Sequence, residues 1–183
     1  MILSMGKSVT CLKMRTLHVT YCSGKKNPID EGTPEQIYDS QRITSFIEVC
    51  KFKAYDWAIL SAKYGLFFPY EVNKNYNVTF KSVEYECRIV EDGIVLSKSE
   101  SRKHISILEQ QVRKRILENT IEKVVFYCRP PIKRRKCYLY VLHAGVDGCA
   151  MNHEKWGDLV EHVTEMYSNG TGKIHVITKL RRL

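Results

Sequence analysis

The sequence predicts an α/β protein, a three-layer α/β/α sandwich around a mainly parallel central sheet. Short apolar segments rich in β-branched residues alternate along the 183-residue chain with longer segments whose apolar residues recur at helical spacing. A connection that contains a helix separates the first two strands, which favours parallel pairing and a right-handed crossover. We interpret residues 1–15 as a loose N-terminal extension and residues 16–183 as a single domain with an insertion at about 67–100.

The first part of that domain predicts a β–loop–α–β unit. Thr16–Tyr21 and Asp56–Ser61 are mostly apolar and are expected to be strands. Between them, Thr33 is expected to cap a helix, with Pro34 at its first position and Gln36 completing a capping box. The helix that follows is expected to bury one face, made by Ile43, Phe46, Ile47 and Cys50.

The rest of the chain continues the alternation. Glu91-Asp92-Gly93 predicts the turn of a small hairpin. The remaining expected elements are a helix at about 101–119 with Ile105, Leu108, Val112 and Ile116 inward, a strand at 123–128, a strand or helix at 137–144, a helix at about 153–168, and a strand at 174–178.

The charge and the cysteines restrict the partner and the compartment. The formal net charge of +9 favours a polyanionic partner, either nucleic acid or a phosphorylated substrate. No run of about 18 apolar residues is present, so no membrane span is expected. The N-terminus has no convincing secretory signal, and seven cysteines is an odd count, so we expect a reduced cytoplasmic protein without a disulfide framework.

Polar and cationic residues follow the expected strands at the point where each one ends. In open α/β sheets, ligands bind outside the carboxyl ends of the strands, which makes these tips a candidate site. The backbone around Ser23 and Gly24 is suited to approach an anion, although neither glycine-containing tip matches a known nucleotide-binding pattern. The tips are Cys22-Ser23-Gly24-Lys25-Lys26, Ser61-Ala62-Lys63-Tyr64-Gly65 and Cys128-Arg129.

Two of these tips supply rival nucleophiles. Lys63 directly follows an apolar strand, and neighbouring lysines would lower its pKa and make it a base or nucleophile. Cys22 is the alternative, because clustered lysines such as Lys25 and Lys26 favour a thiolate. The simpler interpretation is that the lysines are solvated loop charges and that Cys22 is a small buried residue at a strand end.

The same residues carry a resemblance to a known family. Cys22-Ser-Gly-Lys-Lys26, Ile37-Tyr-Asp-Ser40 and Ile59-Leu-Ser-Ala-Lys-Tyr-Gly-Leu66, followed by Pro69 and Tyr76, resemble an uncharacterised family of the uracil-DNA-glycosylase-like superfamily. The segment from about 17 to 80 is also similar to the motif-bearing domain of archaeosine synthase. In that comparison Cys22, Lys26, Tyr38 and Ser40 match in order, with a longer loop before Tyr38 and with Arg42 near the place of a histidine.

The resemblance implies an α/β/α fold and the handling of nucleobases. The acidic water-activating loop of the glycosylases is not evident after Cys22, which argues against simple uracil excision. We expect Cys22, Lys26 and Lys63 to be catalytic. Tyrosines at the tips are expected either to stack on a flipped base or to pack the loop. The expected substrate-binding residues are Ser23, Gly24, Lys25, Tyr38, Ser40, Ser61, Tyr64, Gly65, Tyr76 and Arg129.

Clusters of basic residues outside the tips predict a surface that follows phosphates. Binding through such a surface weakens steeply with salt, whereas a merely solvated face would show no such binding. The expected nucleic-acid-binding residues are Arg113, Lys114, Arg115, Lys133, Arg134, Arg135 and Lys136. Cys149 and His153 have a metal-like spacing, but no second close pair completes a zinc pattern, so neither a metal nor a cofactor is expected.

Taken together, these features favour an enzyme that removes or modifies a nucleobase in DNA or RNA. The alternatives are a non-catalytic nucleic-acid-binding module and a hydrolase or transferase that acts on a free nucleotide.

Overall fold

A mainly parallel six-stranded sheet forms the centre of the molecule in a computed structural model, which describes residues 15–83, 86–127, 136–147, 160–166 and 173–177. The strand order is β11-β10-β9-β1-β3-β4. Strands β10, β9, β1 and β3 run parallel, while β11 and β4 add antiparallel edges. Their bounds are β1 Thr16–Tyr21, β3 Asp56–Ser61, β4 Gly65–Phe67, β9 Lys123–Tyr127, β10 Val160–Met166 and β11 Lys173–Ile177. The expected mixed α/β class with a mainly parallel sheet is therefore confirmed.

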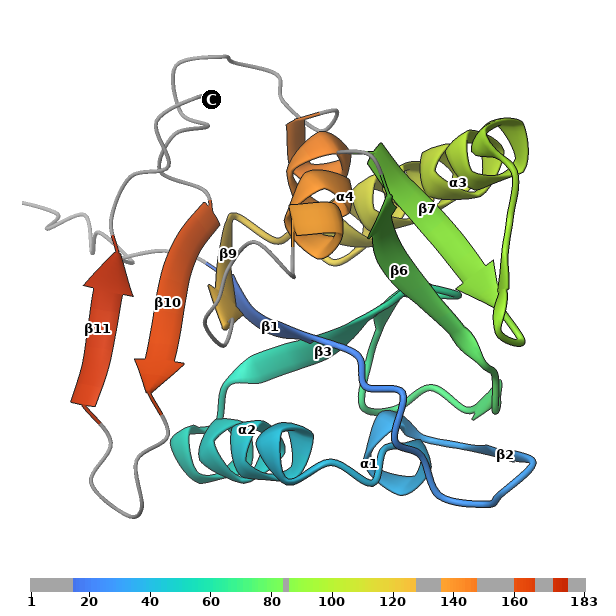
Figure 1. The fold of residues 1–183 in the computed structure, drawn as a ribbon. Helices are drawn as coiled ribbons and strands as arrows, with labels where there is room; N and C mark the ends of the chain where they lie inside the picture. Colours follow the sequence, from blue (N-terminus) through green and yellow to red (C-terminus); the bar gives the residue numbers. More distant parts are fainter. Residues whose placement is uncertain (1–14, 84–85, 128–135, 148–159, 167–172, 178–183) are drawn as a thin grey trace, which may run out of the picture.

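Four helices accompany the sheet in the described ranges, and apolar side chains fill the space between them. They are α1 Pro34–Ile37, α2 Gln41–Lys53, α3 Lys98–Glu118 and α4 Lys136–Asp147. Figure 1 shows α2 on one side of strands β1 and β3, and α3 with α4 on the other. Phe46 of α2, Leu17 and Ile59 of the sheet, and Leu108 of α3 are fully buried. None of the described helices is long and apolar enough to cross a membrane.

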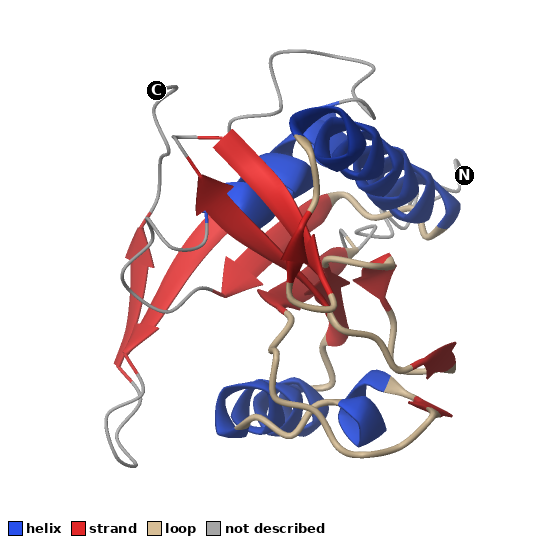
Figure 2. Ribbon diagram, turned by 45° about the vertical axis from the view of Figure 1, so that its right-hand side comes forward, coloured by secondary structure: helices blue, strands red, loops and turns tan. Residues whose placement is uncertain are grey.

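The strands between β4 and α3, within the insertion expected at about 67–100, pair outside the main sheet. Part of this segment, β5 Asn73–Lys74, pairs with β2 Glu31–Gly32. Further along, β6 Val78–Val83, β7 Glu86–Glu91 and β8 Ile94–Val95 form a separate antiparallel sheet. Figure 2 shows the long β6 and β7 pair apart from the central sheet and next to helices α3 and α4, which they contact.

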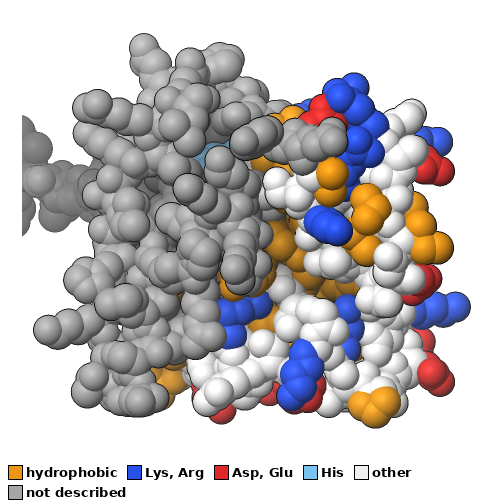
Figure 3. Space-filling view, viewed as in Figure 1, with side chains coloured by type: hydrophobic (Ala, Val, Ile, Leu, Met, Phe, Trp, Pro, Cys, Tyr) orange, Lys and Arg blue, Asp and Glu red, His pale blue; other side chains and the backbone are white. Residues whose placement is uncertain are grey.

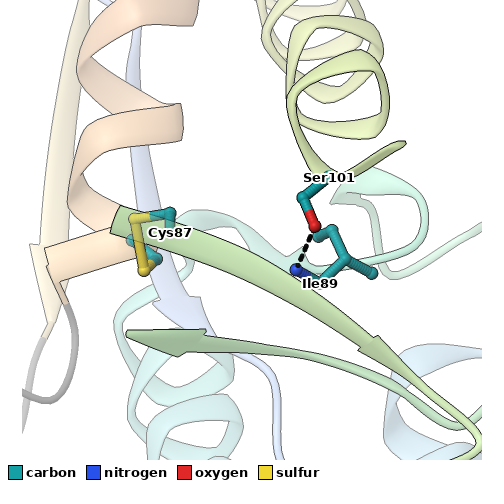
Figure 4. The surroundings of a disulfide bond; sticks show 4 residues. Cys87, Ile89 and Ser101 are labelled. Carbon is teal, nitrogen blue, oxygen red and sulfur yellow. Dashed lines mark hydrogen bonds between the residues drawn. A yellow bond between two sulfur atoms is a disulfide. The ribbon is translucent and has the colours of Figure 1, made fainter. Parts of the chain in front are cut away.

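A disulfide between Cys87 of β7 and Cys137 of α4 joins the antiparallel sheet to the helix layer (Figure 4). The two Cα atoms are 5.5 Å apart, and 50 residues of sequence separate them. Near it, the backbone N–H of Ile89 donates to the hydroxyl of Ser101 on α3. The expectation of cysteines without disulfides is wrong for this pair. Counting cysteines could not reveal it, because the fold brings together two residues that are 50 positions apart in the sequence.

The first helix is shorter than the capping box indicates, and its early end matters for the site. The Gln36 side chain accepts from the Thr33 backbone N–H at 2.9 Å, so the capping box is confirmed. The helix nevertheless stops at Ile37. Tyr38 adopts an extended conformation and forms a β-bridge with Lys26. This bridge draws the chain out of the helix, and α2 begins anew after Ser40.

The other expected elements are confirmed except one. The hairpin turns at Asp92 and Gly93, both with positive φ, and α3 buries the predicted face. The ambiguous segment 137–144 is helical. The helix expected at about 153–168 is wrong over Val160–Met166, which is strand β10, paired with β9 and β11, and the rest of that range lies outside the described residues. Its β-branched residues suit a strand, and sheet pairing overrides the apparent helical spacing.

Candidate active site

The carboxyl ends of β1 and β3 lie side by side, as the sequence predicts. Tyr21 stands opposite Leu60 in the parallel register, and the Cys22 backbone N–H donates to the Leu60 carbonyl at 3.0 Å. Cys22 and Ser61 therefore follow at neighbouring positions of the same sheet edge. Both are almost fully buried, with 5% and 1% of their surface exposed. Parallel pairing thus brings together two residues that lie 39 positions apart in the sequence.

One hydroxyl group contacts the sulfur of Cys22, and three more form a hydrogen-bonded chain in the same cluster. The Tyr138 hydroxyl on α4 lies 3.1 Å from the Cys22 Sγ. The Ser61 hydroxyl donates to the Tyr76 hydroxyl at 2.8 Å, and the Tyr76 hydroxyl is hydrogen-bonded to that of Tyr38. A negative charge on Cys22 is close enough to act electrostatically on all three tyrosines. We call these residues together with Lys26 the Cys22 cluster, whose members are Cys22, Lys26, Tyr38, Ser61, Tyr76 and Tyr138.

Lys26 supplies the cation of the Cys22 cluster. Its Nζ donates to the Tyr76 carbonyl at 2.6 Å and lies 4.0 Å from the centre of the Tyr76 ring. The bridge between Lys26 and Tyr38 holds the backbone in place. Burial lowers the pKa of Lys26 from its ordinary value, and the nearby Cys22 opposes this effect by raising it. Because burial is the larger effect, Lys26 gives up its proton more readily than a solvated lysine does, although the charge of Cys22 acts against this.

The tyrosines of the cluster are proton donors at neutral pH. Burial is the main cause that raises the pKa of Tyr38, Tyr76 and Tyr138 well above the ordinary tyrosine value, and the negative charge of Cys22 adds to it. Each hydroxyl therefore stays protonated. A neutral hydroxyl can donate to an anion, so the cluster is equipped to stabilise negative charge on the sulfur or on a bound group.

An open cavity of about 540 Å³ reaches this cluster from solvent. Cys22 and Tyr138 line it, together with the loop after β1, the start of α2 and part of β6. In the view of Figure 3, Lys and Arg side chains lie around an apolar area of the described surface. The lining residues are Tyr21, Cys22, Ser23, Gly24, Lys25, Asp39, Ser40, Gln41, Arg42, Thr79, Phe80 and Tyr138.

Arg42 lines the cavity and forms hydrogen bonds to the end of strand β1. Its guanidinium donates to the Thr20 hydroxyl and to the Tyr21 carbonyl, both at 2.6 Å. The same group lies 3.7 Å from the centre of the Tyr21 ring. Lys25, at the rim, pairs with Asp39 at 2.8 Å. The cavity wall therefore contains two cations and one carboxylate, with Arg42 held in a fixed position.

Lys63 is directed elsewhere. Its backbone N–H and that of Tyr64 donate to the Ser61 hydroxyl, each at 3.0 Å. The side chain instead reaches Glu91 of β7, with 2.8 Å between Nζ and the carboxylate. The hydrogen bond from Lys63 lowers the pKa of Glu91. Lys63 is not among the residues that line the cavity, so the structure does not bring its amine to the sulfur of Cys22 through that cavity.

The remaining predicted binding residues divide between the cavity and its surroundings. Ser23, Gly24, Lys25 and Ser40 line the cavity, while Tyr38, Ser61 and Tyr76 belong to the Cys22 cluster. The Tyr64 hydroxyl donates to the Lys74 carbonyl, and its ring meets that of Tyr76 edge-on at 5.2 Å. Gly65 has a φ of +68°, so it serves the backbone turn. Arg129 lies outside the described residues.

The predicted basic surface is partly neutralised where the structure describes it. Arg115 pairs with Glu71 at 2.6 Å, and Lys114 approaches Glu118 at 3.7 Å. Arg113 lies on the same helix, and Lys136 is the first residue of α4. The expected basic residues 133–135 lie outside the described ranges, as do Cys149 and His153. No group of three or more His, Cys, Asp or Glu side chains suited to a metal ion occurs within the ranges the structure describes.

Tyr138 is the site residue that sequence reasoning missed. It lies 116 residues after Cys22, in a segment whose strand or helix character the sequence left open. No motif or spacing marks it. Only the packing of α4 beside the end of β1 shows that its hydroxyl reaches the sulfur.

Comparison of the chain with protein families, curated proteins and solved structures found no match. The resemblance to the uracil-DNA-glycosylase-like superfamily therefore stays a prediction from the motifs, and the function must be argued from the site.

Proposed function

We propose that this protein processes a nucleobase of DNA or RNA, by N-glycosylase-like removal or by modification, and that Cys22 is its nucleophile. The observation that carries the proposal is the position of the Cys22 sulfur. It lies at the carboxyl end of a parallel strand, on the wall of an open cavity, with a protonated tyrosine 3.1 Å away. We also propose that the helices on the two sides of the sheet complete a three-layer α/β/α sandwich.

In base removal, the Cys22 thiolate attacks the sugar carbon that bears the base. The sulfur–carbon bond forms as the carbon–nitrogen bond breaks, and the electron pair of that bond leaves with the base. The Tyr138 hydroxyl on the cavity wall and the charge of Lys26 stabilise the departing anion, and Lys26 supplies its proton. Water then attacks the sugar carbon, which restores the thiol. In this proposal Lys63 is not the nucleophile, since its amine is paired with Glu91 and does not line the cavity.

The cavity is large enough to make this use of the cluster reasonable. A volume of about 540 Å³ falls within the usual range for small-molecule sites and can accept a single flipped nucleotide. The aromatic side chains of Phe80 and Tyr138 on its wall offer surfaces for stacking. We also propose a cytoplasmic location, which the sequence predicts and which suits a nucleic-acid substrate.

The direct test uses DNA and RNA oligonucleotides that carry modified bases. After incubation, mass spectrometry should detect a released or altered base, and intact-protein mass spectrometry should detect a transient adduct on Cys22. The Cys22→Ala variant should form neither. Cys50→Ala is the matched control, because Cys50 is the other free cysteine of the described residues and is buried in α2. Intact binding without product or adduct on any substrate would favour the non-catalytic binding module.

One observation favours a second candidate, a hydrolase or transferase for free nucleotides. Two of the three cations predicted on α3 already pair with carboxylates, which weakens the case for a long phosphate-tracking surface there. Replacing Lys133, Arg134, Arg135 and Lys136 by alanine separates the two. Chemistry on a free nucleotide should survive this change, whereas binding to a strand should weaken and lose part of its salt dependence.

A further inference from the structure

The disulfide between Cys87 and Cys137 lies close to the Cys22 cluster in the chain and in space. Cys137 directly precedes Tyr138, the residue whose hydroxyl lies 3.1 Å from the Cys22 sulfur. Cys87 belongs to β7, which pairs along its length with β6. The disulfide therefore ties the first turn of α4, and with it Tyr138, to the antiparallel sheet.

Tyr138 is held between parts of the molecule that the disulfide keeps together. Its ring meets Phe80 of β6 edge-on at 4.7 Å. On the other side it packs against Tyr21 at the end of β1, with 5.5 Å between ring centres. The wall of the Cys22 cavity that consists of Phe80 and Tyr138 thus joins β6 to α4, and the disulfide links α4 to β7, the strand that pairs with β6.

A second cavity opens on one side of the disulfide. Its volume is about 420 Å³, and Cys87 lines it whereas Cys137 does not. Charged side chains of both signs surround Cys87 there, among them Glu86, Lys98 and Arg102, while Tyr140 of α4 closes another side. Cys137 is 5% exposed, and Cys87 is less completely buried. A reagent that arrives from solvent therefore reaches the sulfur of Cys87 more easily than the sulfur of Cys137.

We propose that this disulfide is a redox-active modification site, which a small thiol opens by attacking the sulfur of Cys87 from the 420 Å³ cavity, and that its state controls the exposure of Cys22. A thiolate forms a mixed disulfide with Cys87 and expels Cys137 as a thiolate. A second thiolate then attacks the mixed disulfide, which releases the oxidised small thiol and leaves Cys87 reduced. Two thiols are oxidised to one disulfide, and both cysteine thiolates take protons from water.

Opening the disulfide removes the covalent link between Tyr138 and the antiparallel sheet. Only packing and the hydrogen bonds of the Tyr138 hydroxyl to Cys22 and Thr79 then hold this side chain beside the sulfur, so this wall of the cavity opens more often. The reduced protein should expose Cys22 more and position it less well. That this would lower enzymatic turnover rests on the proposed function, whereas the exchange chemistry and the exposure of Cys22 do not.

The first experiment tests which sulfur is attacked. Cys137→Ala and Cys87→Ala, each left with one cysteine of the pair, are incubated with oxidised glutathione and mapped by peptide mass spectrometry. Cys137→Ala should carry glutathione on Cys87, and Cys87→Ala should carry little on Cys137. Equal adducts, or an adduct on Cys137 alone, would overturn the assignment. Should either variant fail to fold, acid quenching of wild-type protein during reduction by glutathione must trap the mixed disulfide on Cys87.

The second experiment measures Cys22 in the wild-type protein. Iodoacetamide labelling is followed peptide by peptide in the oxidised form and after reduction by dithiothreitol and removal of the reductant. Labelling of Cys22 should accelerate roughly tenfold on reduction, as local opening exposes it. Cys50 is the internal control, since it is buried in α2 and should keep its rate.

The outcome of this labelling is independent of any enzymatic assay. An unchanged Cys22 rate would contradict the proposal, and so would equal acceleration of Cys22 and Cys50, because that would indicate general loosening of the fold. In Tyr138→Phe the effect of reduction on Cys22 should shrink, because part of the protection is already gone. Failure to find a nucleobase product in either redox state would refute the proposed function and leave this result standing.

Discussion

The ends of β1 and β3 are neighbours built from similar residues, and the structure gives them different surroundings. Each end combines a small hydroxylated residue with a lysine, Ser23 with Lys26 and Ser61 with Lys63. The β1 end leads into the open cavity, and its cation is half-buried beside the sulfur of Cys22. The cation of the β3 end is drawn to Glu91 in the antiparallel sheet. The two strand ends are similar in sequence, but elements later in the chain surround them differently and so give them different chemistry.

The sharpest test of this difference is to remove the reactive group from each end. Cys22→Ala should reduce the rate of nucleobase processing at least about a thousandfold, as the loss of a covalent nucleophile does. Lys63→Met, which keeps the length and apolar character of the side chain, should change the rate by less than about threefold, because its surface ion pair is worth little. Rates are compared by single-turnover kinetics with product detected by mass spectrometry.

The reverse order of effects would show that the β3 end carries the chemistry. Borohydride trapping adds a check, since a lysine nucleophile forms a reducible Schiff base. An adduct that disappears in Lys63→Met would restore Lys63 to the role that the sequence left open.

The Cys22 end should also show a characteristic loss of stability at alkaline pH. Burial raises the pKa of Tyr38, Tyr76 and Tyr138 above the ordinary value of 10.0, so the folded protein keeps protons that the unfolded chain gives up. The contribution of these tyrosines to the free energy of unfolding is therefore fully present below pH 10 and is lost as the pH rises above it. The free energy of unfolding should fall by about 1.4 kcal/mol per pH unit for each tyrosine once the unfolded chain has ionised.

The lowered pKa of Lys26 changes stability with pH in the opposite direction to the tyrosines. The two contributions can be separated by the pH range in which each acts. The lowered lysine pKa makes stability rise with pH up to its ordinary value of 10.5, above which Lys26 contributes no further slope. Urea unfolding at several pH values between 10.5 and 12 should therefore report the tyrosines. The free energy of unfolding of Tyr138→Phe should fall less steeply with pH than that of wild type, because one tyrosine no longer contributes to the slope. A slope that is the same in both proteins would mean that Tyr138 ionises in the folded state.

A smaller effect on the free energy of unfolding is expected from removing the hydroxyl of Tyr76, compared with removing that of Tyr64. Tyr76→Phe removes the group that accepts from Ser61 and bonds with Tyr38, and these partners are buried. The free energy of unfolding should fall by about 1–3 kcal/mol, the usual cost of leaving buried polar groups unpaired. Tyr64→Phe is the matched control. Its hydroxyl bonds only the Lys74 carbonyl near the surface, so the loss should be about 1 kcal/mol or less. Equal losses in urea titrations would contradict a buried network around Tyr76.

Local patterns predicted much of the sheet and the strand tips. The bounds of β1 and β3 agree with the sequence, because both strands are apolar runs that end in polar residues. Parallel pairing then places Cys22 beside Ser61 without further information. Lys26 and Tyr38 were also predicted to belong to one site. In the structure a β-bridge joins them, and the short helix α1 ends at Ile37, directly before Tyr38.

What the sequence could not predict came from long-range packing. Tyr138 reaches Cys22 only because α4 lies against β6 and the end of β1, and Glu91 reaches Lys63 only because β7 lies beside the β3 end. Neither partner has a sequence pattern that marks it. The strand β10 was expected to be a helix because its apolar residues also fit a helical spacing, and pairing with β9 decided the outcome.

The smallest expected effect belongs to the Lys63–Glu91 pair, and its pH dependence is the reverse of the Cys22 cluster's. Both side chains are more than one third exposed, so Glu91→Gln should change the free energy of unfolding by only about 0–1 kcal/mol. The hydrogen bond from Lys63 lowers the pKa of Glu91 below its ordinary 4.5, so its contribution is present above that pH and is lost as the pH falls through the folded-state pKa. Thermal melts at pH 3 to 6 in low salt should show wild type losing slightly more stability than Glu91→Gln as the pH falls, and high salt should reduce the difference. A large gap that persists in high salt would mean that Lys63 and Glu91 are shielded from solvent, and would move the β3 end closer in character to the buried end of β1.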